Sequence, residues 1–302
     1  MRFNLLFVIL FLANLGYSQP QPQIVGGWEA GERFPAIFIF SEFRKQLAEQ
    51  FCTATKVSPD QFLTAAHCVL ALGQKRWYVP QTSFAGQQFY YSFGRDLSKP
   101  EAVHALTIKK VSLHPLLNNC LQKAKYSPAK CHAGGLPTPD VAIITVEKSH
   151  GPFFDAPNLP FDFAPNRAGD EIVIAGYGST QDGDSKPPIL KYGMTQVASK
   201  DELTQAIAGT SAAAMGFMDT GFFFGSLGPL VHKKFPNLGS GDSGGPVIKE
   251  SPDRIVGINS SAVCADGAAS DCEVTSNNFF ARIDSEATIP VGQWIRSILH
   301  RD

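Results

Sequence analysis

The amino-acid sequence predicts an all-β protein that is closed by one C-terminal α-helix. Apolar runs of strand length recur between turn-rich gaps, and 27 Gly and 21 Pro among 302 residues favour many turns over long helices. Only near the C-terminus do apolar residues repeat at three- and four-residue steps, which is typical of one face of a helix. These two patterns carry the prediction of the fold class.

Several segments have the length and the flanking residues of β-strands. Each is apolar or alternating and is bounded by Gly, Pro, Asn, Asp or Ser. The segments are Ile37–Phe40, Phe62–Ala65, Val141–Val146, Glu171–Ala175 and Ile255–Ile258. The terminal helix is expected over about 291–300, where one face would carry Val291, Trp294, Ile295, Ile298 and Leu299.

Two longer segments have no clear periodicity. Pro115–Thr138 holds Cys120 and Cys131, so we expect it to be a surface loop closed by a disulfide. Gly209–Gly228 is rich in Gly, Ala and Phe, and its pattern predicts no particular element.

The first residues have the features of an export signal. Arg2 gives a cationic start, Leu5–Ala13 is an unbroken apolar run, and Gly16-Tyr17-Ser18 suits a cleavage after Ser18. The competing interpretation, an uncleaved membrane anchor, is disfavoured because a spanning helix needs about 20 apolar residues. Residues 1–18 are therefore predicted to be a signal peptide. The mature protein is expected to be secreted, extracellular or periplasmic in a bacterium, with no membrane span.

The charge balance excludes some classes of function. The chain has 26 Lys+Arg against 27 Asp+Glu, a formal net charge of −1. Without a basic excess, counterion release cannot drive binding to nucleic acid or to an anionic membrane, so no nucleic-acid partner is expected. With 44% hydrophobic residues the chain can bury a core, which rules out a disordered chain.

Six cysteines are expected to form disulfides, because export leads to an oxidising compartment. They fall into three close couples, and pairing within each couple is the simplest framework: Cys52–Cys68, Cys120–Cys131 and Cys264–Cys272. A zinc site is the competing interpretation, and its only local support is His132 beside Cys131. Since no C-x2-C spacing occurs, we expect no metal.

Four short motifs point to one chemistry when they are taken together. Alone, His67 would be an ordinary surface histidine, Asp140 a residue at the start of a strand, and the glycines a polar turn. The motifs follow one another as Ile24-Val25-Gly26-Gly27, Thr64-Ala65-Ala66-His67-Cys68, Asp140-Val141-Ala142-Ile143-Ile144 and Gly241-Asp242-Ser243-Gly244-Gly245-Pro246. In this order the chain resembles the trypsin/chymotrypsin family of serine peptidases. Further matches are His114-Pro115, Gly176-Tyr177-Gly178 and Trp294.

The resemblance implies a fold and a domain organisation. Members of the family have two antiparallel six-stranded β-barrels, with the active site in the cleft between them, and a C-terminal α-helix. Residues 19–23 would then be a short propeptide and 24–302 the peptidase domain. Its first barrel would span about 24–150, its second about 151–290, and its terminal helix about 291–300.

The resemblance also assigns catalytic roles. Ser243 would be the nucleophile and His67 its general base, since a serine hydroxyl needs an adjacent base at neutral pH. Asp140 would hold the imidazole in the right tautomer, and Ser260 would hydrogen-bond Asp140. The amides of Gly241 and Ser243 would form the oxyanion hole. This chemistry requires no metal or organic cofactor.

Activation in the family inserts a new N-terminus that pairs with the acidic residue before the serine. Here that pair would be Ile24 and Asp242, and the uncut chain would be a zymogen. Gln23 is not the Lys or Arg that trypsin-like activators require. Cleavage by a different protease, or autoprocessing, is one interpretation; the alternative is a catalytically silent chain.

The disulfides follow the family pattern only in part. Cys52–Cys68 matches the family disulfide that braces the histidine loop. The usual cysteine two residues before the Gly-Asp-Ser run is replaced by Gly239. Cys264 thus loses its expected partner, and we expect it to close a local loop with Cys272.

The predicted substrate pocket also departs from the family pattern. Its floor would be Asn237, and an uncharged amide cannot pair with Arg or Lys as an aspartate would. Leu238 makes the floor partly apolar. The remaining expected pocket residues are Ser260, Ser261, Ala262 and Asn278, the last standing where a glycine is common and narrowing the pocket.

These features predict a secreted serine endopeptidase that forms an acyl-enzyme intermediate. Expected partners are protein or peptide substrates, a protein inhibitor and an activating protease. The alternative is a silent serine-peptidase homologue that binds protein partners, motivated by Gln23 and the altered pocket wall. Use of the same residues by an esterase or acyltransferase is a third interpretation.

Overall fold

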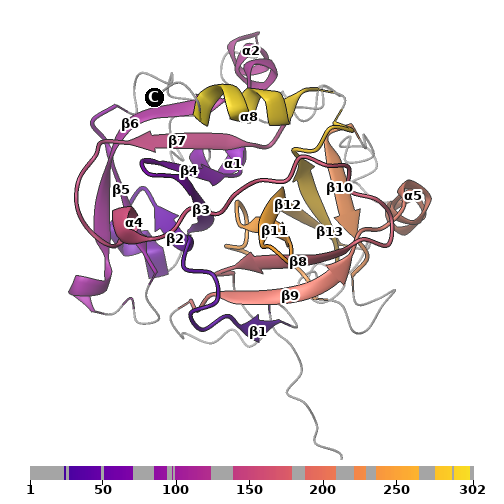
Figure 1. Ribbon diagram of the computed structural model, residues 1–302, viewed down its shortest axis with the longest axis horizontal. Coiled ribbons are helices and arrows are strands. Elements are labelled where there is room, and N and C mark those ends of the chain that lie inside the picture. The colour runs from indigo at the N-terminus through magenta and orange to yellow at the C-terminus, as the bar shows by residue number, and fades with distance from the viewer. Residues whose placement is uncertain are drawn as a thin grey trace, which may run out of the picture.

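Six antiparallel strands close into a barrel (Figure 1). The computed structural model describes residues 24, 27–48, 51–70, 85–93, 97, 99–123, 139–178, 188–208, 221–228, 236–264, 276–287 and 289–299. Around the barrel the strands follow the order β2, β3, β4, β7, β6, β5. Their bounds are β2 (Ile37–Ser41), β3 (Cys52–Ser58), β4 (Gln61–Thr64), β5 (Gln88–Ser92), β6 (His104–Leu113) and β7 (Ala142–Val146). The predicted strands that begin at Ile37, Phe62 and Val141 are confirmed.

Aromatic rings fill the interior of the barrel. The Phe38 ring makes edge-to-face contacts with Phe62, Tyr91, Phe93 and Phe153, at centroid distances from 5.3 to 5.7 Å. Edge-to-face geometry brings the positive edge of one ring to the negative face of another, so these contacts are favourable beyond the area they bury. The packed rings hold β2 and its neighbour β3 in place. Strand β3 supplies residues to the candidate active site.

Seven further strands form a second sheet in the order β1, β9, β8, β11, β12, β13, β10. Their bounds are β1 (Trp28–Glu29), β8 (Glu171–Gly176), β9 (Lys191–Gln196), β10 (Phe223–Ser226), β11 (Pro246–Lys249), β12 (Arg254–Cys264) and β13 (Ser276–Arg282). The predicted strands that begin at Glu171 and Ile255 correspond to β8 and β12. The fold class is thus confirmed: the chain is mostly strands in two sheets, with few helices.

The second sheet has one strand more than the six expected. The additional strand β1 comes from the N-terminal part of the described chain and forms the edge of the sheet, where it pairs with β9. Its Trp28 ring packs on Tyr192 with the centroids 5.6 Å apart, and Phe34 meets the same ring at 5.7 Å. These aromatic contacts explain why a two-residue strand joins this edge.

The terminal helix α8 (Val291–Leu299) is confirmed, and it returns from the second sheet to the barrel (Figure 1). The Trp294 ring meets the ring of His114, at the end of β6, with the centroids 5.4 Å apart. Ile295 is fully buried. The helix therefore packs across the junction of the two sheets.

The prediction that Pro115–Thr138 is a loop is wrong for its first part, which forms the helix α2 (Pro115–Lys123). Burial lowers the pKa of His114 to about 4, so its ring is neutral near pH 7, and its Nδ1 accepts a hydrogen bond from Leu116 N. This contact caps the start of the helix. Leu117, Cys120 and Leu121 are buried at helical spacing, a period that is visible in the sequence.

Other helical segments were not expected from the sequence either. They are α1 (Ala66–Leu70), α4 (Pro152–Asp155), α5 (Lys200–Ile207) and the 3-10 helices η1 (Arg44–Ala48) and η3 (Pro100–Ala102). Helix α5 begins with a capping box, in which Ser199 Oγ accepts from Glu202 N and the Glu202 carboxylate accepts from Ser199 N. Of the unassigned segment Gly209–Gly228, the described part contains β10.

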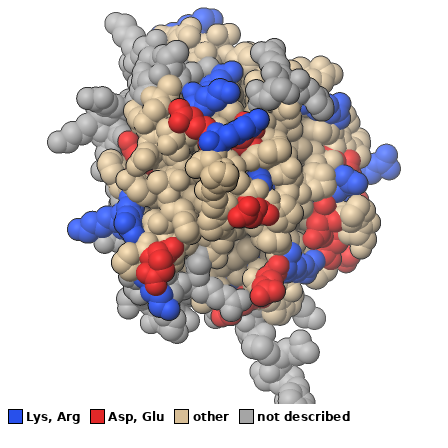
Figure 2. Space-filling view, turned by 60° about the vertical axis from the view of Figure 1, so that its left-hand side comes forward, with Lys and Arg blue, Asp and Glu red and all other residues tan. Residues whose placement is uncertain are grey.

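The predicted signal peptide and propeptide, residues 1–23, lie outside the described residues. Within the part that the structure describes, no helix has the length and apolarity needed to cross a bilayer. On the face seen in Figure 2, Lys and Arg side chains are intermingled with Asp and Glu, in keeping with the net charge of −1.

Lys56 of β3 is a buried cation that caps helix α4. The residue is only 2% exposed, and its Nζ donates hydrogen bonds to the carbonyls of Phe154 and Ala156. Burial lowers the pKa of Lys56, although Asp155 works in the opposite direction. The contact fixes the start of the connection between the two sheets, because α4 follows directly on β7.

We predict that Lys56→Met destabilises the protein by about 1–3 kcal/mol, because it removes the charged donor from the two half-buried carbonyls. Chemical denaturation of the purified variant measures this change in the free energy of unfolding. Lys110→Met is the matched control, since Lys110 is exposed on β6, and it should change the stability by no more than about 0.5 kcal/mol. Equal effects of the two substitutions would contradict the role of Lys56 as a cap.

Candidate active site

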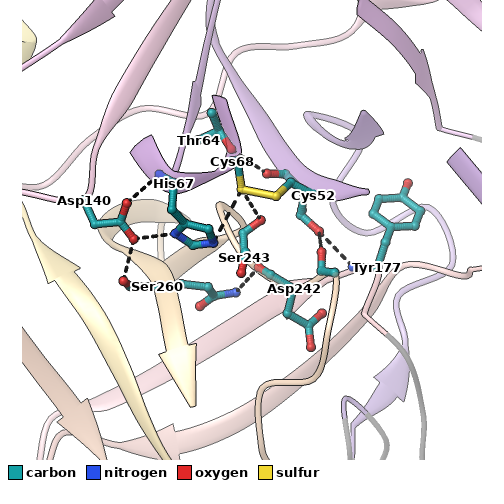
Figure 3. Close-up of a disulfide and its surroundings, with 12 residues drawn as sticks. Cys52, Thr64, His67, Cys68, Asp140, Tyr177, Asp242, Ser243 and Ser260 are labelled. Carbon is teal, nitrogen blue, oxygen red and sulfur yellow. Dashed lines mark hydrogen bonds and ion pairs between the residues drawn. A yellow bond between two sulfur atoms is a disulfide. The ribbon is translucent and has the colours of Figure 1, made fainter. Parts of the chain in front are cut away.

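The carboxylate of Asp140 lies buried where the two sheets meet, and it accepts hydrogen bonds from both (Figure 3). From the barrel side, His67 N donates to Oδ1 over 2.9 Å, and His67 Nδ1 lies 2.7 Å from Oδ2. From β12 of the second sheet, Ser260 Oγ donates to Oδ2 over 2.6 Å. The structure therefore brings these three sequence-predicted residues into one hydrogen-bonded cluster.

His67 is held in place by its position in the short helix α1. The helix follows β4 directly, and the Cys52–Cys68 disulfide joins it to β3, which confirms this predicted pair. With Asp140 on Nδ1, the other ring nitrogen, Nε2, points away from the carboxylate (Figure 3). The imidazole is about a third exposed, with 37% of its side chain accessible, so Nε2 is able to exchange a proton with a partner.

The site's two titratable groups shift each other's pKa. Burial of the imidazole opposes its charged form, but the negative charge of Asp140 and the hydrogen bond to it outweigh burial and raise the pKa of His67. Burial alone would raise the pKa of Asp140. The charge of His67, together with hydrogen bonds from His67 and Ser260, instead lowers it to about 2. Asp140 is thus an anion at neutral pH, and His67 is a stronger base than a free histidine.

The turn that carries Ser243 requires glycine on both sides. Gly241 has φ +99° and Gly244 has φ +82°, conformations that other residues rarely adopt. A Cβ at Gly241 would also collide with the Phe51 ring, and one at Gly244 with Thr64 and the backbone of Thr53. The glycines therefore let the serine turn pack directly against the barrel.

Ser243 lies next to the imidazole (Figure 3). The Cys68 sulfur is 3.9 Å from His67 Nε2 and 3.6 Å from the Ser243 carbonyl oxygen. His67 and Ser243 therefore lie on the same sulfur atom and close to each other. Among the described residues, no hydrogen bond joins the Ser243 hydroxyl to His67. Such bonds are often long in the absence of substrate.

The amides of Gly241 and Ser243 are predicted oxyanion donors. Neither donates a hydrogen bond to an acceptor within the described ranges, whereas the neighbouring amide of Gly244 donates to the Asn259 carbonyl over 2.8 Å. Two unpaired N–H groups in one tight turn are available to an incoming oxygen atom.

Asp242 and Ile24 are both buried, each only 1% exposed. Ile24 packs in an apolar cluster of the second sheet with Leu238 and Val247. The Asp242 carboxylate accepts hydrogen bonds from Gly178 N over 2.7 Å and Gly239 N over 2.8 Å. A side chain at Gly178 would collide with this carboxylate, which accounts for a glycine there. The ion pair between Ile24 and Asp242 stays a prediction.

The expected pocket residues lie together on the second sheet, but several have no access to solvent. Asn237 and Asn278 are both 0% exposed, and Leu238 and Ser260 are also buried, whereas Ser261 and Ala262 are half-buried. The Asn278 side chain accepts from Leu238 N and donates to Ser226 Oγ and the Pro236 carbonyl, over 2.8 to 3.0 Å. Asn278 thus connects β13 to β10 and to the segment that leads to Ser243. The sequence did not indicate Ser226 as a residue of this site.

Three nearby cysteine and histidine ligand atoms, from Cys52, His67 and Cys68, lie within 4.8 Å of one another. Both sulfurs belong to a disulfide, so neither is a thiolate that could bind a metal ion. Cys120 is also disulfide-bonded, and its predicted partner Cys131 lies outside the described residues, as do His132 and Cys272. The side chain of Cys264 is likewise not described.

Comparisons with known proteins agree with this geometry. The family model described as trypsin matches residues 24–283. Among solved structures, neuropsin, a serine protease expressed in the limbic system of mouse brain, is similar with a TM-score of 0.58 and 16% sequence identity. The match covers 90% of this chain and 98% of that chain. At this identity the likeness to neuropsin shows the fold alone.

We predict that His67 has a pKa above 6.5 and that Asp140→Asn lowers it, because burial then acts without an opposing charge. Proton NMR of the His67 ring across a pH titration measures this shift. Asp170→Asn is the control: its carboxylate pairs with Lys249 rather than with His67, and the substitution should leave the His67 pKa unchanged. An unchanged pKa in Asp140→Asn would show that the carboxylate does not govern the imidazole.

Proposed function

The chain belongs to the trypsin family, and we propose that it is an exported serine endopeptidase that hydrolyses peptide bonds of proteins. The observation that carries the proposal is the line of contacts from Ser260 through Asp140 to His67, with Ser243 beside the imidazole. This is the arrangement that nucleophilic catalysis by a serine requires: a nucleophile, a base and a group that orients the base.

In the proposed mechanism Ser243 Oγ attacks the carbonyl carbon of the peptide bond, and its proton passes to His67 Nε2. The tetrahedral intermediate then expels the amine, which takes this proton, and an acyl-enzyme remains. Water, activated by the same nitrogen, attacks the ester and releases the acid. Asp140 stays ionised throughout and stabilises the imidazolium, in keeping with its pKa of about 2.

The negative oxygen of the tetrahedral intermediate would be bound by the amides of Gly241 and Ser243. Hydrogen bonds that are already oriented toward the developing charge are among the largest contributions to such catalysis. The proposed chemistry uses side chains and amides of this chain alone.

Activation is proposed to follow removal of a signal peptide, residues 1–18, and a propeptide, residues 19–23. The freed amine of Ile24 would pair with Asp242, and the burial of both residues supports this. Because Gln23 precedes the cut, the activating protease would differ in specificity from trypsin, or the chain would cut itself.

The buried amides of Asn237 and Asn278 support a pocket for small uncharged side chains. A long basic side chain would find no anion at Asn237, and neither Asn237 nor Asn278 is exposed to solvent. Opposite charges are intermingled on the face seen in Figure 2, so selectivity is expected to arise from residues beside Ser243.

We predict that secreted protein whose N-terminus is sequenced as Ile24 reacts covalently with a fluorophosphonate probe, and that Ser243→Ala abolishes labelling because the nucleophile is absent. In-gel fluorescence measures the labelling. Ser240→Ala, a substitution of an exposed serine in the same loop, is the control and should label like the wild type. If the mature protein neither labels nor cleaves any member of a peptide library, the endopeptidase proposal is wrong and the alternative of a catalytically silent homologue takes its place.

The same library tests the pocket. We predict at least about tenfold higher kcat/KM for peptides with a small uncharged residue before the cut than for those with Arg or Lys, since binding a cation without a partner costs more than 1.4 kcal/mol. Asn278→Gly should increase cleavage after larger apolar residues by opening space. Dominant cleavage after Arg or Lys would overturn this assignment.

A further inference from the structure

We propose that Thr53 is a positioning residue whose hydroxyl orients the oxyanion hole from the opposite sheet. This inference rests on the proposed serine-peptidase function, which gives the amides of Gly241 and Ser243 their role. Thr53 lies in β3 of the barrel, far from Gly241 in sequence, and it is fully buried.

Every polar group of Thr53 has a partner around the serine turn. Its Oγ1 donates to the Gly241 carbonyl over 2.8 Å and accepts from Tyr177 N over 3.0 Å. Its backbone N donates to the Ser243 carbonyl over 2.9 Å, and its carbonyl accepts from Thr64 Oγ1 over 3.0 Å. Thr53 therefore donates hydrogen bonds to two carbonyls of the turn, those of Gly241 and Ser243, on either side of Asp242.

The Gly241 carbonyl is the point where this turn most needs a fixed orientation. Gly241 has no side chain and a φ of +99°, so its backbone can reach conformations closed to other residues. The peptide plane between Gly241 and Asp242 is rigid, and only rotation about the Gly241 Cα sets its direction relative to the Gly241 N–H. The Thr53 hydroxyl holds the carbonyl of that plane, and Asp242 N, at its other end, donates to the Gly239 carbonyl over 3.1 Å. These two bonds fix the plane that follows the Gly241 donor and so limit how the chain can rotate there.

The next peptide plane is held from the second sheet. The Asp242 carbonyl accepts from Gly245 N over 3.0 Å and from Asn259 Nδ2 over 3.3 Å. Because the peptide is planar and trans, the Ser243 N–H points opposite to this carbonyl. Asn259 thus orients the Ser243 donor, and Thr53 holds the peptide plane that links the Gly241 donor to it. Each sheet contributes one side-chain constraint on the predicted oxyanion hole.

Thr53 suits this role because its hydroxyl can take few other orientations. Its χ1 is restricted by the β-branched side chain, and β3 is held rigidly beside the aromatic interior. Thr55, two residues along the same strand and also 0% exposed, has an Oγ1 with no hydrogen-bond partner among the described residues. Thr55 is therefore a matched control, a buried threonine whose hydroxyl bonds to no described group.

The kinetic test compares Thr53→Val, which keeps the shape but removes the hydroxyl, with Thr55→Val. We expect Thr53→Val to lower kcat about tenfold and to change KM by less than about twofold, because a mispositioned donor weakens binding of the transition state rather than of the substrate. Thr55→Val should keep wild-type kcat. A second pair, Thr53→Ser and Thr53→Ala, differs by one hydroxyl and provides the test if the valine variant folds poorly. The serine variant should have a kcat within about threefold of that of the wild type. Equal kcat values for Thr53→Ser and Thr53→Ala would overturn the proposal.

Amide hydrogen exchange tests the positioning without any turnover. The Tyr177 amide, which donates to Thr53 Oγ1, and the amides of Gly244 and Gly245 should exchange at least about tenfold faster in Thr53→Ala than in Thr53→Ser. If the wild type cleaves no peptide but this difference is present, the proposed function fails while the positioning by Thr53 stands. If the wild type is active and the exchange rates are equal, Thr53 does not position the turn.

Discussion

The site depends on one buried charge, the carboxylate of Asp140. A carboxylate taken out of water costs several kcal/mol unless hydrogen bonds replace its hydration. Here His67 contributes two contacts from the barrel and Ser260 one from the second sheet, all within 2.9 Å. Because the donors come from both sheets, the charge is satisfied only when the sheets lie in one relative position. The same contacts lower the pKa of Asp140 to about 2 and make His67 a stronger base.

The turn that bears Ser243 is held by the same junction. Its carbonyls accept hydrogen bonds from Thr53 of β3 and from Asn259 of β12, while two of its amides remain unpaired within the described residues. Glycines at 241 and 244 allow the turn to approach the barrel closely enough for these contacts. The arrangement thus combines a backbone held by hydrogen bonds with two amides that are free to donate, which is what the proposed oxyanion hole requires.

The sequence was sufficient for features that depend on neighbouring residues. The five predicted strands, the amphipathic face of the terminal helix and the motifs around His67, Asp140 and Ser243 are all local patterns. Helix α5 was missed although Ser199 and Glu202 form a readable capping box, as was the helical period of α2. No local signal could reveal the contact between Thr53 and Gly241, the cap that Lys56 provides or the ties made by Asn278, because their partners are distant in the chain and meet only through the fold.

The activation of Ser243 by His67 is tested most directly by the rate at which a fluorophosphonate modifies the mature protein as a function of pH. Peptide mass spectrometry identifies the modified residue. We predict a single adduct, on Ser243, and a rate that falls as His67 becomes protonated, with its midpoint above pH 6.5. An adduct on another residue, or a rate on Ser243 that does not change between pH 5 and 9, would contradict the claim that the base paired with Asp140 activates this serine.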